Sequence, residues 1–166
     1  YKRQIYTGAK FTRLYFKDCY IDGTTDFIFG PSTALFEDCI IHSKRNSYVT
    51  AASTPKEAKY GYVFKHCKLT AEPGVDKVYL GRPWRPYAYT LFIECELGKH
   101  IVSAGWHNWG KQSNEETARY MEYKNTGEGA NASERVAWSK QLTKKEAEAV
   151  TVDAIFRTQS NWNPID

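Results

Sequence analysis

Two short segments of the chain carry the residue types that could do chemistry, one built around an aspartate and the other around an arginine. The first is Gly23–Gly30, which reads GTTDFIFG and places Asp26 between threonines and aromatic residues. A carboxylate in such surroundings is partly desolvated, and this changes its strength as a nucleophile. The same aspartate could instead cap the end of a strand in a turn, and this segment alone favours the turn.

The second segment is Leu80–Pro86, which reads LGRPWRP. Its two prolines stiffen the loop, so that Arg82 can bind a carboxylate through two hydrogen bonds. Trp84 offers a flat face to a sugar ring. Alternatively, Arg82 is a surface residue stacked on an aromatic neighbour. If the two segments lie on nearby coils of one fold, we expect Arg82 to reach Asp26.

A repeat indicates the fold that would position these segments. The pattern Phe-x-x-Cys-x-(Ile/Leu) occurs four times and contains all four cysteines, at 16–21, 36–41, 64–69 and 92–97. A repeat of this length is one coil of a solenoid, and its β-branched and aromatic residues predict short strands. Stacked parallel strands lie about 4.8 Å apart. The repeat therefore predicts an all-β parallel β-helix with inward-facing ladders of Phe and Cys, in which inserted loops line one binding face.

The four cysteines could form two disulfides, ligate a metal or remain free. No Cys-x-x-Cys pair is present, which argues against a zinc site. Cysteines stacked in register point in the same direction, and this gives poor disulfide geometry. We therefore expect free, buried thiols that pack as small apolar groups.

The chain changes character beyond residue 110. Residues 117–123 alternate in polarity and predict a further strand. Residues 142–150 predict a short helix in which Thr143 and Glu146 form a capping box, and 152–156 predict a second short helix. Because an open coil exposes apolar side chains and strand edges, these helices are expected to cover one end of the solenoid.

The length of 166 residues predicts a single domain over 1–166. Nothing precedes the first coil to cap it, so we expect the C-terminal part of a longer β-helix, or a partner that covers this edge. The net charge of +4 suits an acidic polymer as partner. There is no Lys/Arg block typical of nucleic-acid binding and no apolar run near the ~20 residues that span a bilayer.

The motifs GTTDFIFG and YLGRPW together resemble the signature of the pectin methylesterases. The resemblance runs from about residue 6 to the end, its spacing is similar to that of bacterial members, and it includes Ser47–Ser53, Gly105–Trp109, Glu122–Gly127 and Arg135–Trp138. It implies a right-handed parallel β-helix that hydrolyses the methyl esters of galacturonan and releases methanol. It also implies an extracellular or periplasmic location, and neither a metal nor an organic cofactor.

The resemblance assigns roles to five residues. Asp26 matches the nucleophile, which would form an acyl-enzyme, and Arg82 matches the arginine that orients it. Trp84 and Phe29 match aromatic positions that contact the sugar. Thr25 lies beside the nucleophile, at a position where members of the family vary.

The matching acid is missing. The family's Gln-Asp pair, which supplies an oxyanion donor and a general acid, falls on Lys2 and Arg3. An arginine does not give up its proton near neutral pH, and losing general acid–base help costs about 10²–10⁴-fold in rate. The alternatives are a galacturonan-binding module with little turnover and a β-helix lyase. The lyase is less favoured, because the sequence shows no carboxylate cluster for Ca²⁺.

Overall fold

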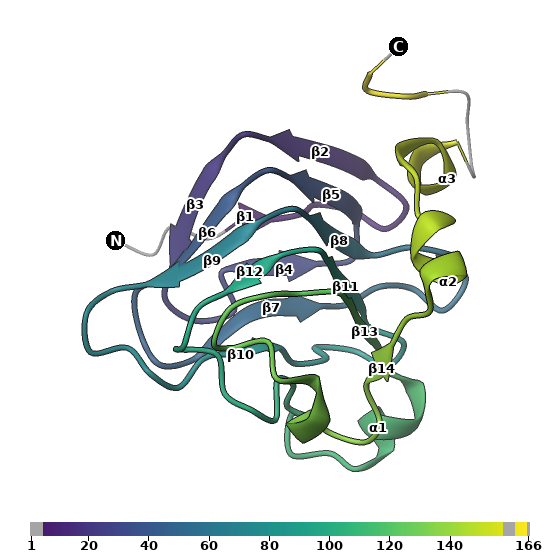
Figure 1. The fold of residues 1–166 in the computed structure, drawn as a ribbon. Coiled ribbons are helices and arrows are strands. Elements are labelled where there is room, and N and C mark those ends of the chain that lie inside the picture. Colours follow the sequence, from purple (N-terminus) through teal and green to yellow (C-terminus); the bar gives the residue numbers. More distant parts are fainter. Residues whose placement is uncertain (1–4, 158–161, 166) are drawn as a thin grey trace.

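The computed structural model describes residues 5–157 and 162–165, and within them the chain winds through three parallel sheets (Figure 1). The first has the order β1-β4-β7-β10 and consists of Ile5–Tyr6, Ile28–Gly30, Tyr48–Ala52 and Tyr79–Gly81. The second has the order β2-β5-β8-β11-β13-β14 and consists of Arg13–Lys17, Thr33–Glu37, Tyr62–Lys65, Tyr89–Ile93, Arg119–Tyr123 and Lys140–Gln141. The third has the order β3-β6-β9-β12 and consists of Tyr20–Gly23, Ile40–Ser43, Lys68–Ala71 and Glu96–Leu97.

The pairing of these strands confirms the predicted parallel β-helix. Every registered strand pair is parallel, and from β1 to β12 the chain visits the three sheets in the same order. Strands β1, β2 and β3 lie at the edges of their sheets among the described residues. Within that part of the chain, no helix is long and apolar enough to cross a membrane.

The Phe ladder lies inside the solenoid as the repeat predicts. The rings of the four phenylalanines stack face to face, with centroid separations of 4.8, 4.5 and 4.4 Å along Phe16, Phe36, Phe64 and Phe92. The last three of these rings are fully buried. A second ladder of Ile and Leu occupies the third sheet at Ile21, Ile41, Leu69 and Leu97.

The residue before each cysteine makes the corner between the second and third sheets. These residues have left-handed backbone conformations, with φ of 52°, 54°, 54° and 50° at Asp18, Asp38, His66 and Glu94. One left-handed residue turns the chain sharply, and Asp and His tolerate it better than most side chains. The cysteine that follows then points inward. All four cysteines are free thiols, as expected, and three are fully buried.

The fifth coil ends the ladder with a buried ion pair. Glu122 occupies the position next to Phe92 where a further phenylalanine would stand. Its carboxylate accepts hydrogen bonds of 2.7 and 3.1 Å from Nε and Nη2 of Arg135, and both side chains are only 3% exposed. Nη2 of Arg135 also donates to the carbonyl of Gly129 at 2.6 Å. The segment 128–139, which includes the 3₁₀ helix Ala132–Glu134, therefore closes this end of the interior.

The two predicted C-terminal helices form, but they do not cover the end of the solenoid. Helix α2 (Lys144–Glu148) begins at the predicted capping box, and α3 (Val152–Phe156) begins after Thr151. Both pack on the outer face of the second sheet (Figure 1). The reason is that this outer face is itself apolar, with buried side chains at Leu35, Val63, Leu91, Ile93 and Tyr123.

The strand predicted over 117–123 is shorter than expected. Thr117 is the last residue of a short helix, α1 (Ser113–Thr117), and the strand β13 begins at Arg119. Polar alternation alone did not distinguish the end of this helix from the start of the strand.

His100 makes the stability of the fold depend on pH. Its side chain is buried, its Nε2 has no hydrogen-bond partner among the described residues, and burial followed by the charge of His42 lowers its pKa to about 4. The unfolded chain binds this proton near pH 6.5. The contribution to stability is therefore complete above about pH 6.5 and is lost as the pH falls towards 4.

We expect His100→Gln to remove this dependence. Between pH 7 and pH 4.5, the free energy of unfolding of the unaltered chain should fall by about 2–3 kcal/mol more than that of the variant. Urea denaturation at the two pH values measures the difference. An equal fall in the free energy of unfolding of the two proteins would show that His100 does not cause the pH dependence.

Candidate active site

Asp26 is held at a tight bend between β3 and β4. Its backbone is left-handed, with φ of 48°, and its N–H donates to the carbonyl of Tyr48 at 2.9 Å. The next two residues, Phe27 and Ile28, are buried and fix the bend from inside. Aspartate tolerates this conformation, and unusual backbone angles at partly exposed residues concentrate at functional sites. The bend leaves the carboxylate 18% exposed on the outer face of the first sheet.

Arg82 binds this carboxylate through two hydrogen bonds. Nε donates to Oδ1 of Asp26 at 3.0 Å, and Nη2 donates to Oδ2 at 2.6 Å. The backbone N–H of Arg82 donates to the carbonyl of Thr50 at 3.0 Å, which fixes the start of the loop. Gly81 precedes it, and a Cβ there would lie 2.1 Å from Oγ1 of Thr50, so the approach requires glycine. The predicted contact between the two segments is thus present.

Two aromatic rings enclose the guanidinium of Arg82. Its Cζ lies 3.9 Å from the ring centroid of Tyr48 and 3.7 Å from that of Trp109. Neither ring was predicted to have a role, although both fall in segments that resemble the family. Such stacking holds the planar guanidinium in one orientation and stabilises its charge. We call Tyr48 and Trp109 the arginine clamp.

His107 supports one side of the clamp. Its Nδ1 accepts a hydrogen bond of 3.0 Å from the backbone N–H of Trp109, whose own φ is 63°. Burial, followed by the positive charge of Arg82, lowers the pKa of His107. A neutral imidazole with an unprotonated Nδ1 is the form that can accept this bond.

We expect the clamp to affect rate more than substrate binding. Replacing Tyr48 with leucine removes one ring from Arg82, and the loss of a contact worth about 1–2 kcal/mol should lower kcat about tenfold. Tyr48→Phe keeps the ring face and should retain most of the rate. The measurement is methanol release at saturating methylated pectin, the substrate that the sequence resemblance implies. Equal losses in the two variants would contradict a role for the ring face.

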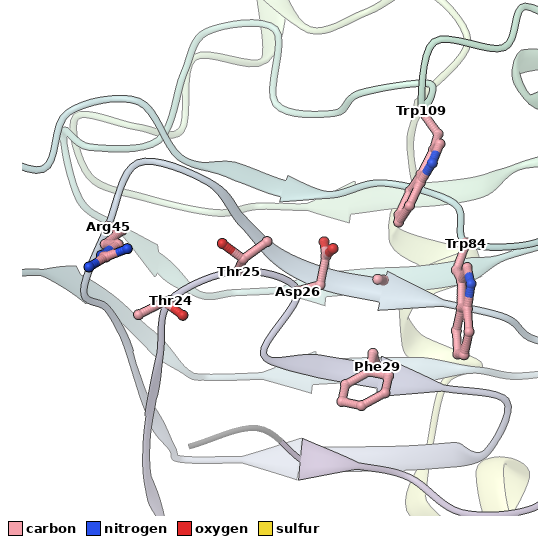
Figure 2. Close-up of a pocket in the computed structure, with 8 residues that line it drawn as sticks. Thr24, Thr25, Asp26, Phe29, Arg45, Trp84 and Trp109 are labelled. Carbon is pink, nitrogen blue, oxygen red and sulfur yellow. The ribbon is translucent and has the colours of Figure 1, made fainter. Parts of the chain in front are cut away.

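A pocket of about 450 Å³ lies in front of the carboxylate, and it is lined by Thr24, Thr25, Asp26, Phe29, Arg45, Ala51, Trp84 and Trp109. Figure 2 shows Arg45 at one end, Asp26 in the middle, and Phe29 with Trp84 at the other end. The rings of Phe29 and Trp84 lie 5.9 Å apart, and Trp84 is 37% exposed. This end therefore presents an aromatic surface of the kind that sugar rings stack on.

The pocket brings together four of the five predicted site residues, and the fifth, Arg82, binds the carboxylate at its centre. Oγ1 of Thr25 accepts a hydrogen bond of 2.9 Å from Ser47. Arg45 was not predicted, because it is an exposed loop residue without a motif around it.

Asp26 is the only carboxylate that lines the pocket within residues 5–157 and 162–165. The two residues that stand in place of the expected Gln-Asp pair, Lys2 and Arg3, lie outside the described residues. In the part of the chain that the structure covers, no group of His, Cys, Asp or Glu is arranged to hold a metal ion. The site thus offers an oriented carboxylate and an aromatic surface of the kind that sugar rings stack on.

Fold and site together define a parallel β-helix protein with an oriented aspartate beside aromatic rings. The family model described as Pectinesterase matches residues 1–159, and the chain belongs to that family.

Individual relatives agree with this assignment. The chain is 45% identical over 134 residues to Pectinesterase 31 of Arabidopsis thaliana, covering 80% of this chain and 42% of the relative. The solved pectin methylesterase from carrot superposes with a TM-score of 0.83 at 32% identity, covering 93% of this chain and 54% of that one. A pectin methylesterase in complex with a hexasaccharide gives a TM-score of 0.77 at 29% identity, covering 92% and 52%.

The predicted similarity to bacterial members is wrong. The curated relatives found at 35–45% identity are plant pectinesterases, from Arabidopsis thaliana and Brassica napus among others. The motifs that carry the resemblance identify the family, but the spacing between them did not identify the branch. The chain spans less than half the length of these relatives, for example 42% of Pectinesterase 31 and 28% of the Brassica napus protein.

Proposed function

We propose that this chain carries the nucleophile half of a site that hydrolyses the methyl esters of galacturonan, the acidic polymer of pectin. The observation that supports this most directly is the two-point contact between Arg82 and Asp26. It holds the carboxylate of Asp26 in a fixed direction at the centre of an aromatic-walled pocket. Fixing the direction of attack lowers the entropic part of the barrier.

The proposed reaction proceeds in two steps. One oxygen of Asp26 attacks the ester carbonyl, and the methoxy group leaves as methanol after taking up a proton. The resulting acyl-enzyme is an anhydride, which water then hydrolyses to regenerate Asp26 and leave a free galacturonate. Arg82 keeps the nucleophile oriented in both steps, while Phe29 and Trp84 hold the sugar and Thr25 lines the pocket beside the nucleophile.

A second candidate is a galacturonan-binding module with little turnover. Among the described pocket residues there is no second carboxyl group that could protonate the leaving group, and this favours the binding module. Without such a group the rate would fall by about 10²–10⁴-fold. The aromatic surface would still bind the polymer, so binding alone does not distinguish the two candidates.

Methanol release from highly methylated pectin separates them. We expect the 166-residue chain to release methanol above the uncatalysed rate and to bind the same pectin. Binding without methanol release would favour the module. If the chain neither binds pectin nor releases methanol, pectin is not its substrate. For an esterase acting on pectin, we propose an extracellular or periplasmic site of action.

A further inference from the structure

Arg119, at the start of β13, binds backbone carbonyls with a half-buried guanidinium. Nε and Nη2 donate to the carbonyl of Tyr87 at 2.9 and 2.6 Å. Nη1 donates to the carbonyl of Ala58 at 2.7 Å, and Nη2 donates to that of Pro55 at 3.1 Å. Within the described part of the chain, Arg119 forms no ion pair. The side chain therefore directs its hydrogen bonds at the main chain.

These bonds fix the guanidinium and the carbonyls relative to one another. A charged group that leaves water loses solvation, and burial lowers the pKa of the Arg119 guanidinium. The three carbonyl oxygens offset part of that loss, because hydrogen bonds from a charged donor are stronger than neutral ones. The guanidinium in turn holds the carbonyls, since its planar set of donors matches only one arrangement of them.

The carbonyls that Arg119 binds belong to two loops beside the candidate active site. Loop 53–61 follows β7 and loop 82–88 follows β10, so both lead from the first sheet to the second. The second of these loops contains Arg82, which binds the carboxylate of the site, and Trp84, which lines the pocket. A residue of the fifth coil thus ties together two loops that come from earlier coils.

Tyr87 has a backbone conformation that its side chain disfavours. Its φ of 66° lies in the left-handed region, where a bulky residue is an outlier. It follows Pro86 in a turn that the N–H of Ala88 closes by donating to the carbonyl of Arg85 at 3.3 Å. The third residue of such a turn is usually glycine. Backbone strain of this kind persists only where the surroundings hold it, and the two bonds from Arg119 hold the carbonyl of Tyr87.

We propose that Arg119 is a positioning residue, which keeps loop 82–88 in the conformation that presents Trp84 to the sugar. The proposal rests on the proposed function, because it takes Trp84 to contact the substrate. The N–H of Trp84 donates to the carbonyl of Ala52 at 3.0 Å, so the first sheet fixes the start of the loop. Arg119 fixes its end at Tyr87, and Trp84 lies between the two fixed points.

Loss of Arg119 should therefore weaken substrate binding more than it slows the chemical step. Arg82 keeps contacts that do not involve Arg119. Its backbone N–H donates to the carbonyl of Thr50, and the two rings of the arginine clamp enclose its guanidinium. The oriented carboxylate is thus preserved, while the ring of Trp84 is no longer held in one place.

The test uses three variants of the full 166-residue chain. Arg119→Met removes all four hydrogen bonds. Arg119→Lys keeps the charge but lacks the planar set of donors, so it should restore only part of the hold. Arg13→Met is the matched control, because it also removes an arginine that donates to a backbone carbonyl, that of Phe156 at 2.7 Å, and it lies outside the pocket.

Hydrogen exchange of the amides in 82–88 is measured without ligand, and calorimetry measures the affinity for a partly methyl-esterified oligogalacturonate. We expect Arg119→Met to speed exchange at Ala88 about tenfold or more. Its affinity for the oligomer should fall about fivefold to tenfold, while kcat for methanol release stays within about twofold. Arg119→Lys should lie between this variant and the unaltered chain. The control should change neither the exchange of this loop nor the affinity.

Unchanged exchange in 82–88 would overturn the proposal, and so would faster exchange with unchanged affinity. A fall in kcat as large as the fall in affinity would also contradict it, because Arg119 would then act on the chemical step. If Arg119→Met does not fold, Arg119→Lys carries the same comparison. If the unaltered chain neither binds the oligomer nor releases methanol, the proposed function fails, and the exchange result alone decides whether Arg119 holds the loop.

Discussion

Replacing Asp26 with asparagine is expected to abolish methanol release, by at least about 10³-fold, because an amide cannot form the acyl-enzyme. The exchange keeps the size and shape of the side chain. It also replaces Oδ2, which accepts a hydrogen bond of 2.6 Å from Nη2 of Arg82, by an NH₂ group. An NH₂ group cannot accept that bond. The arginine therefore loses one of its two hydrogen bonds, and the nucleophile is lost with it.

Asp38→Asn is a matched control for this variant. Asp38 has the same left-handed backbone, with φ of 54° against 48° at Asp26, but lies at a corner of the solenoid outside the pocket. We expect it to keep full activity. Pectin binding by Asp26→Asn should persist, because the rings of Phe29 and Trp84 are unchanged. Substantial methanol release by this variant would show that Asp26 is not the nucleophile.

The ladder of phenylalanines explains why most of the fold could be predicted from the sequence. In a parallel β-helix the same side chain recurs at each coil, so a repeated Phe-x-x-Cys motif predicts which residues of stacked strands pair with one another. The residue before the cysteine also recurs as a left-handed corner at Asp18, Asp38, His66 and Glu94. Local pattern and long-range pairing agree here, and that agreement makes the prediction possible.

The contact between Arg82 and Asp26 could be predicted for a related reason, because the repeat places the bend before β4 and the loop after β10 on nearby coils beside the same sheet. The arginine clamp could not. Tyr48 and Trp109 reach the guanidinium from separate coils, and no spacing in the sequence relates them to Arg82.

The ends of the solenoid were harder to predict because ends break the repeat. Helices α2 and α3 pack on the apolar outer face of the second sheet, so they cover the side of the solenoid and not its end. The C-terminal end is closed by Glu122 and Arg135, where the repeat gives way to a charged residue at the Phe position. A repeat predicts the residues that recur in each coil, but it does not predict the residues that close the ends of the solenoid.

Removing Arg135 should cause a large loss of stability. In Arg135→Met the carboxylate of Glu122 stays buried beside Phe92 and loses both hydrogen bonds from Arg135, while the bond of 3.2 Å from Nδ2 of Asn125 remains. The carbonyl of Gly129 loses its donor as well. Breaking a buried pair in this way costs about 3–5 kcal/mol. Urea denaturation measures the change. Lys144→Met, which breaks the exposed pair with Glu148, should cost less than about 0.5 kcal/mol.

A double variant distinguishes the effect of the unpaired buried charge of Glu122 from the effect of the hydrogen bonds that Arg135 donates to the backbone. Glu122→Phe continues the ladder of Phe16, Phe36, Phe64 and Phe92 by one level. Combined with Arg135→Met, it replaces a buried ion pair by apolar side chains, an exchange that is often neutral or stabilising. We expect the double variant to recover more than half of the loss. The remainder should reflect the carbonyl groups of Ser103 and Gly129, which no longer receive hydrogen bonds from Arg135. If the double variant is as unstable as Arg135→Met alone, then the bonds from Arg135 to the backbone, and not its neutralisation of Glu122, close the end of the solenoid.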